Sequence, residues 1–187
     1  AEGLFQQDPT NSEWMMTFGQ AKLNHAIASQ DNAGPDLQAA ESLIYKAHKL
    51  NPKDERTADL LAKVFIAQGQ SALSQGDTDS AAQSAYDAFM VIEPKWKMQA
   101  NEDLRRRKAQ ILLLQGRIAL KNGNRPEAEM KLQSAVGLLE ENAGGELPFT
   151  RLDDLVRALE LAGKPDRAVE YKKRLKASGF VPLQPYP

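Results

Sequence analysis

The chain has 187 residues and a formal net charge of −1, and 42% of its residues are hydrophobic and 26% charged. This composition is ordinary for a globular protein, and the charge balance gives no overall field that would attract nucleic acid or anionic lipid. The chain contains no cysteine, which excludes disulfides and thiolate chemistry, and no apolar run reaches the roughly 18 residues of a membrane-spanning helix.

The first residues, AEGLFQQDPTNSEW, combine the end of one helix with the beginning of another. The Asp-Pro pair favours a turn, and Asn11 or Ser12 can cap a new helix that begins near Trp14. Because the chain opens without an initiator methionine, we expect it to be a segment of a longer protein. A natural N-terminal helix or a processed mature end is the alternative.

Two helical hairpins are predicted in the first half of the chain. In the first, apolar residues at helical spacing flank Gly34-Pro35-Asp36, which we expect to form the turn. In the second, Gly76-Asp77 separates two such stripes, because both residues tolerate the left-handed conformation in which helices end. Pro52 and Pro94 are expected to close the two hairpins.

A third hairpin follows, with Gly123-Asn124 as its turn. Gly116 and Ala128 lack bulk where its two helices would cross, so the backbones can approach closely. Lys95-Trp96-Lys97-Met98 is expected to enter the long first helix, which continues through Arg105-Arg106-Arg107-Lys108.

A fourth hairpin turns at Gly163-Lys164, and Gly179 stops its second helix. The tail that follows contains three prolines, which favour an extended backbone. We expect Phe180, Leu183 and Tyr186 to cover the apolar end of the last hairpin. The alternative is that the PxxP spacing in this tail forms an SH3-type ligand.

The hairpins repeat one pattern of small residues. An alanine follows each turn glycine of the last three hairpins by five residues, and an alanine or leucine follows seven residues later. A glycine lies twelve residues before that alanine in the second and third hairpins, and Val156 takes this place in the fourth. Together with the closing prolines, this pattern resembles the tetratricopeptide repeat (TPR) family.

The resemblance implies an all-α fold, a right-handed α-solenoid of antiparallel helix pairs. About four units are expected, at residues 11–52, 54–94, 97–141 and 149–178, so that 1–178 form a single solenoid and 179–187 an extended Pro-rich tail. The alanines Ala40, Ala81, Ala128 and Ala168 are 41, 47 and 40 residues apart, against roughly 34 in the family. We therefore expect first helices of about twenty residues in three units, or a longer loop before Gly34 in the first.

Catalytic signatures are missing from the sequence. Neither His25 nor His48 has a second histidine or carboxylate at metal-ligand spacing, and no serine lies in a nucleophile elbow. Gly144-Gly145 lacks the context of a phosphate-binding loop. The sequence therefore predicts a protein that is not an enzyme and that has no metal or cofactor.

The run Arg105–Lys108 is the sharpest charge feature. One interpretation is a basic patch for an acidic partner or nucleic acid. The other is a solvated helix face on which Glu102 and Asp103 pair with Arg106 and Arg107 four residues later. We prefer the second and expect no nucleic-acid binding, because no aromatic residues interleave with the basic ones.

In the TPR family the first helices line a concave groove that takes an extended peptide or a partner helix. Carried over by the motif, the resemblance implies a groove lined by Met16, Gln20, Leu23, Lys63, Ile66, Gln70, Leu73, Gln110, Leu113, Arg117, Lys121, Asp153, Arg157 and Glu160. The alternative is that the overlong helices cover Ile66 and Leu113 and leave no open groove. The family's Lys and Asn residues for C-terminal carboxylates are replaced here by Ile66, Gln70, Leu113 and Arg117, so chaperone tails are not expected as ligands.

The sequence thus predicts a non-catalytic scaffold for protein–protein interaction. The array and its Gly-aromatic-Pro tail are also similar to the C-terminal TPR arrays of bacterial Ser/Thr kinases and membrane-spanning winged-helix regulators, which implies a larger bacterial signalling or envelope protein. The alternatives are a homo-oligomerisation module that packs through the end near Trp14, and a regulatory domain that binds a small molecule between helices. The partner and the compartment, cytoplasmic or extracytoplasmic, stay open.

Overall fold

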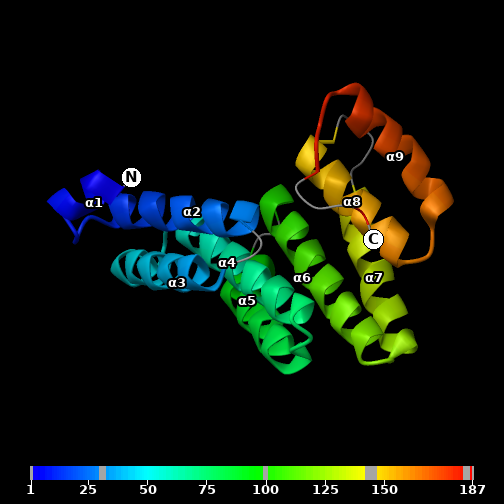
Figure 1. The fold of residues 1–187 in the computed structure, drawn as a ribbon, viewed down its shortest axis with the longest axis horizontal. Coiled ribbons are helices and arrows are strands. Elements are labelled where there is room, and N and C mark those ends of the chain that lie inside the picture. The colour runs from blue at the N-terminus through cyan, green and yellow to red at the C-terminus, as the bar shows by residue number, and fades with distance from the viewer. Residues whose placement is uncertain (1, 30–32, 99–100, 142–146, 183–185, 187) are drawn as a thin grey trace. The chain divides into compact units, whose positions relative to one another are not determined.

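The computed structural model describes residues 2–29, 33–98, 101–141, 147–182 and 186. Over these residues the chain is all-helical, with nine helices and no strand (Figure 1). The helices are α1 (Glu2–Gln7), α2 (Ser12–Ser29), α3 (Ala33–Leu50), α4 (Glu55–Ser74), α5 (Thr78–Met98), α6 (Glu102–Lys121), α7 (Arg125–Glu140), α8 (Phe149–Leu161) and α9 (Pro165–Ala177). The chain divides into two compact units, Ala1–Ala100 and Asn101–Pro187.

The first unit contains two helix pairs that pack on each other. Helix α2 packs against α3 and α4 against α5, while α3 also packs against α4 and α2 touches α4. Leu23, Ile44 and Leu61 are fully buried between these helices. Helix α1 lies against α2, where the ring centroids of Phe5 and Phe18 are 5.6 Å apart.

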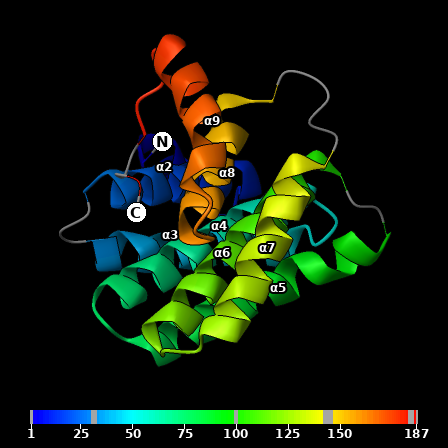
Figure 2. The same cartoon turned by 90° about the vertical axis from the view of Figure 1, so that its right-hand side faces the viewer.

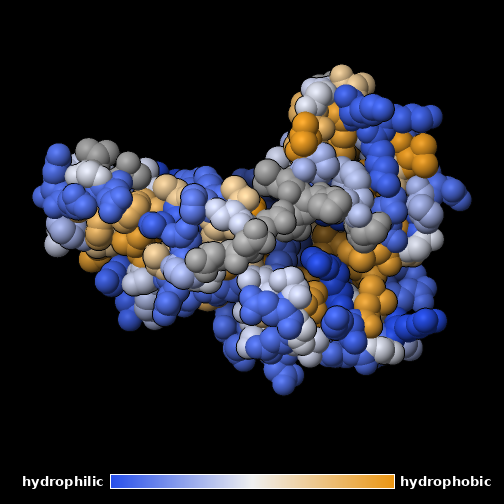
Figure 3. Space-filling model, viewed as in Figure 1, coloured by the Kyte–Doolittle hydropathy of each residue, from blue (hydrophilic) through white to orange (hydrophobic). Residues whose placement is uncertain are grey.

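The second unit repeats this packing with α6 to α9, as the green-to-orange helices of Figure 2 show. Helix α7 packs between its partner α6 and the next helix α8, and α8 packs against α9. Leu132, Leu139, Leu152, Leu155 and Leu159 form the centre of its core. In the space-filling view, patches of hydrophobic residues lie among hydrophilic ones on the visible surface of this unit (Figure 3).

Three of the predicted turns are confirmed, and all three have the same hydrogen bonds. Gly76, Gly123 and Gly163 have φ values of 84°, 76° and 68°, a left-handed conformation that favours glycine. In each turn the next residue donates its backbone N–H to a carbonyl five residues earlier, at 2.8 to 2.9 Å. Gly179 has a φ of 74° and ends α9 in the same way.

The four alanines that mark the repeat occupy the same environment. Ala40, Ala81, Ala128 and Ala168 are all 0% exposed. In two of the pairs, a glycine of the first helix faces the residue that comes four positions after this alanine in the second helix. A Cβ atom added to Gly19 would lie 2.7 Å from Ile44, and one added to Gly116 would lie 2.7 Å from Leu132. Close approach of the helices in these pairs therefore depends on glycine, as the sequence predicted for Gly116.

The prediction of first helices of about twenty residues in three units is confirmed. Helices α2, α4 and α6 contain 18, 20 and 20 residues, whereas α8 contains 13.

Three boundary predictions are wrong. Gly34 lies in the first turn of α3 and not in the turn before it, because Gly and Pro are tolerated where helical N–H groups have no partner. Pro94 does not close its unit, since α5 continues to Met98. Lys95–Met98 therefore belongs to α5. The next helix, α6, begins separately at Glu102, and the side chain of its N-cap residue Asn101 accepts a hydrogen bond from Leu104 N at 2.9 Å.

Candidate partner-binding face

The predicted groove residues lie on the first helix of each pair. Within the first unit they come from α2 and α4, which touch, and within the second unit from α6 and α8, which also touch. Each unit thus brings its own share of these residues together on two neighbouring helices.

The apolar members of this set do not form an open surface. Met16, Leu23, Ile66, Leu73 and Leu113 are all buried. Met16 and Leu23 belong to the core of the first unit, and Leu113 belongs to that of the second. Ile66 and Leu113 are 5% and 8% exposed, so both are covered, as the alternative interpretation held for these two residues.

The polar members are accessible to different degrees. Gln20 and Lys121 are exposed, and Gln70 is half-buried. Lys63 is half-buried and forms an ion pair with Asp59 at 2.8 Å, one helical turn away.

A buried carboxylate that the sequence analysis did not select joins α6 to α8. Asp154 Oδ2 accepts hydrogen bonds from Arg106 Nε at 2.6 Å and from Gln110 Nε2 at 2.9 Å. Burial raises the pKa of Asp154, and the Arg106 guanidinium opposes this effect. Gln110 also accepts a hydrogen bond from Arg107, so its amide is already engaged within the unit.

The basic run Arg105–Lys108 is therefore not a solvated face. Arg107 is 5% exposed, Arg106 pairs with Asp154, and Arg105 lies 3.5 Å from Glu141. Glu102, expected to pair with Arg106, instead contacts Arg151. The residue spacing predicts ion pairs within one helix. The packing of successive hairpins instead brings the carboxylates of Glu141 and Asp154 close to these arginines.

Arg151 ties the beginning of α8 to the helices before it. Its side chain is buried and donates from Nε to Leu139 O at 2.8 Å, from Nη2 to Glu141 O and from Nη1 to Glu102. These contacts satisfy carbonyls at the end of α7, which the helix itself leaves without a partner.

Two further predicted residues, Arg117 and Arg157, place positive charge on α6 and α8. Arg157 Nε donates to Asp153 Oδ2 at 3.2 Å. Arg117 is half-buried, and its pKa is lowered by burial and by the positive charge of Arg157. The face thus carries two cations, one of which is paired with the carboxylate of Asp153.

The C-terminal tail reaches the same face. The Tyr186 ring centroid lies 5.0 Å from the guanidinium carbon of Arg157 and 5.0 Å from Lys172 Nζ. Burial and the hydrogen bond to Asp153 raise the pKa of Tyr186 to about 12. Phe180 and Tyr186 both pack on the core of this unit, as predicted, while Leu183 lies outside the described residues.

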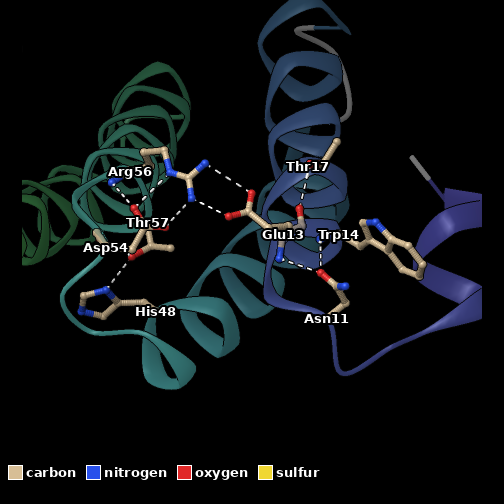
Figure 4. A network of polar contacts seen from close by, with 8 residues as sticks. All are labelled: Asn11, Glu13, Trp14, Thr17, His48, Asp54, Arg56 and Thr57. Carbon is tan, nitrogen blue, oxygen red and sulfur yellow. Dashed lines mark hydrogen bonds and ion pairs between the residues drawn. The ribbon is translucent and has the colours of Figure 1, made fainter.

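In the first unit a polar network connects α2 with the beginning of α4 (Figure 4). Arg56 donates to Glu13 Oε1 at 2.5 Å and to Asp54 Oδ2 at 2.8 Å, and the Arg56 guanidinium lowers the pKa of Asp54. Asn11 caps α2, as predicted, by accepting from Glu13 N and Trp14 N.

The two histidines have structural partners. His48 Nδ1 lies 2.8 Å from Thr57 Oγ1, and because Thr57 already donates its hydroxyl proton to Asp54 O, His48 is the donor (Figure 4). Burial and the charge of Lys95 lower the pKa of His48. His25 Nδ1 lies 2.5 Å from Asp36 Oδ2. In the described part of the chain, no cluster of three or more His, Cys, Asp or Glu residues could hold a metal ion.

Over the same described residues, none of the helices has the length and apolar character needed to cross a membrane. No protein-family model matches the chain, and no curated protein matches it.

Proposed function

We propose that the chain is a TPR-like scaffold for protein–protein interaction, in which helix pairs stack as a right-handed solenoid and the first helices receive an extended peptide or a partner helix. The scaffold is non-catalytic and binds no nucleic acid, and it serves a larger bacterial signalling or envelope protein. One observation carries this proposal. The same glycine turn, the same fully buried alanine and the same order of helix contacts recur along the chain.

Contacts between first helices support the position of the site. In stacked helix pairs, the first helices of successive pairs lie side by side and present one continuous face. Here α2 touches α4 and α6 touches α8, and the predicted groove residues that stay accessible on them are polar. Recognition then rests on amides and cations, with Gln70 as the central contact of the first unit and Arg117 as that of the second.

A phage-displayed library of random twelve-residue peptides tests this function. Peptides enriched on the wild-type chain are expected to bind Arg117→Glu or Gln70→Ala at least tenfold more weakly, which corresponds to about 1.4 kcal/mol. Arg125→Glu and Gln83→Ala are matched controls, because both residues are exposed on second helices. Peptides that bind all four variants equally would contradict the proposal.

A further inference from the structure

The C-terminal tail makes specific polar contacts in addition to covering apolar surface. The Tyr186 ring lies close to two cations, and the Asp153 carboxylate raises the pKa of its hydroxyl, so both ends of the side chain meet a charged group. The three residues involved are Asp153 and Arg157 on α8 and Lys172 on α9, which we call the tyrosine site.

Ion pairs that do not involve the tail hold both cations of the tyrosine site. Arg157 is held by its ion pair with Asp153, one helical turn before it. Lys172 is held by an ion pair with Glu160 at 2.5 Å, which also joins α9 to α8. The side chains of Asp153 and Arg157 are only 16% and 19% exposed. The cations therefore keep their positions without the tyrosine, and the site is preorganised for an aromatic ligand.

Phe180 and Tyr186 lie against successive turns of α8. The Phe180 ring lies 6.4 Å from the ring of Phe149 at the beginning of α8, and Tyr186 meets Asp153 and Arg157 one and two turns further on. Asp153 and Arg157 are also predicted groove residues. The tail thus occupies part of the surface that the proposed function assigns to a partner.

We propose that the tyrosine site binds a tyrosine in an extended segment of a partner protein, and that the chain's own tail fills the site as a tethered ligand. This inference deepens the proposed function, on which it rests, by naming the kind of ligand taken at α8. A partner segment with a tyrosine competes with Tyr186. Only a segment whose affinity or concentration is high enough to displace the tail therefore binds.

The chemistry of the site selects tyrosine among aromatic residues. Phenylalanine keeps the contact with the two cations but has no hydroxyl to offer the Asp153 carboxylate, which then has Arg157 as its donor. A phosphotyrosine brings a dianion next to Asp153, and this repulsion opposes its attraction to Arg157 and Lys172. The preferred ligand is therefore an unmodified tyrosine with its hydroxyl proton in place.

The test uses the full chain and a fluorescent peptide with the tail sequence GFVPLQPYP. Because a tethered tail competes at a high effective concentration, the peptide is expected to bind Tyr186→Ala about tenfold or more tightly than the wild type. A peptide with phenylalanine in place of tyrosine is expected to bind Tyr186→Ala at least threefold more weakly. Adding Arg157→Gln to Tyr186→Ala is expected to remove most of the binding, whereas Tyr86→Ala, an exposed tyrosine in α5, should behave as wild type.

A second measurement does not depend on the folding of any tail variant. In wild-type protein labelled with 3-fluorotyrosine, the Tyr186 resonance is identified by its loss in Tyr186→Phe. Excess tail peptide should move this resonance toward the shift of the free peptide. Equal peptide affinity for wild type and Tyr186→Ala, or a resonance that does not respond, would overturn the proposal and leave the tail as a structural cap.

The two proposals fail in distinguishable ways. Suppose that the library peptides do not bind Arg117→Glu but bind the wild type and Tyr186→Ala with equal affinity. The scaffold function then stands, and the proposal that the tail is a tethered ligand is refuted. Suppose instead that the tail peptide binds as expected but that substitutions of Gln70 and Arg117 do not change the affinity of the library peptides. The tyrosine site then stands, and the wider groove is refuted.

Discussion

At the scale of single residues, a glycine within a helix stabilises or destabilises the fold according to which atoms face it. A Cβ atom on Gly116 in α6 would lie 2.7 Å from Cγ and Cδ2 of the buried Leu132, whereas one on Gly137 in α7 would meet nothing within 4 Å. The first glycine lets two helices approach, and the second only weakens its own helix. The pair offers a matched test of packing against helix propensity.

We expect Gly116→Ala to lower the free energy of unfolding by about 1 kcal/mol, since overpacking costs about 1–3 kcal/mol and exceeds the gain in helix propensity. Gly137→Ala is expected to raise it by about 0.5–1 kcal/mol. Urea unfolding followed by circular dichroism measures both. Changes of the same sign would contradict the close approach at Gly116.

The raised pKa of Tyr186 makes tail docking depend on pH. The docked tail favours the neutral phenol, so docking is fully favourable below the ordinary tyrosine pKa near 10 and is lost as the pH rises toward about 12. The phenolate absorbance of wild type minus that of Tyr186→Phe isolates this group. We expect a difference titration with a midpoint well above pH 10, and a midpoint at 10 would show an undocked tail.

At the scale of elements, successive helix pairs are joined by polar contacts as well as by apolar packing. Asp154 receives Arg106 and Gln110 of α6, and Arg151 reaches both α6 and the end of α7. Each contact joins the first helix of one pair to elements of the preceding pair. Polar groups buried in this way fix which turn of one helix faces which turn of the next, because any other register leaves them unpaired.

Arg151→Ala is expected to lower the free energy of unfolding of the second unit by about 2–3 kcal/mol, because it leaves buried carbonyls such as Leu139 O without a donor. Arg167→Ala is the matched control. Its ion pair with Glu140 is half exposed and contributes about 0–1 kcal/mol. Guanidinium unfolding monitored by amide hydrogen exchange in residues 101–141 and 147–182 measures both effects, and similar losses for the two variants would argue against an interior role of Arg151.

At the scale of the whole molecule, contacts within each unit join helices that are adjacent or next-adjacent in sequence. Folding then requires the closure of short loops only, and the units grow by adding one helix to the next. Architectures of this kind fold quickly, because few contacts of long sequence separation must form before the core is stabilised.

We therefore expect the main refolding phase, measured by stopped-flow fluorescence of Trp14 and Trp96, to finish within milliseconds. The chain contains ten prolines, so a minor phase of tens of seconds that prolyl isomerase accelerates is also expected. A dominant phase of seconds that the isomerase leaves unchanged would contradict folding through local contacts.

The sequence by itself was sufficient for features that depend on a few neighbouring residues. The turns at Gly76, Gly123 and Gly163, the cap at Asn11 and the buried alanines follow from backbone conformation and helical spacing, which are local properties. The local signals failed where two were in conflict, as at Pro94, which disfavours a helix that its neighbours continue.

Only the tertiary structure decided which distant side chains meet. Arg106 and Asp154 are separated by 48 residues, and Tyr186 meets Asp153 from beyond the last helix. Such pairs depend on the rotation of each helix about its axis and on the path of the tail, which packing sets and residue spacing does not encode. For the same reason the apolar groove residues proved to be buried, because a helix that touches neighbours on several sides has no apolar face left for a partner.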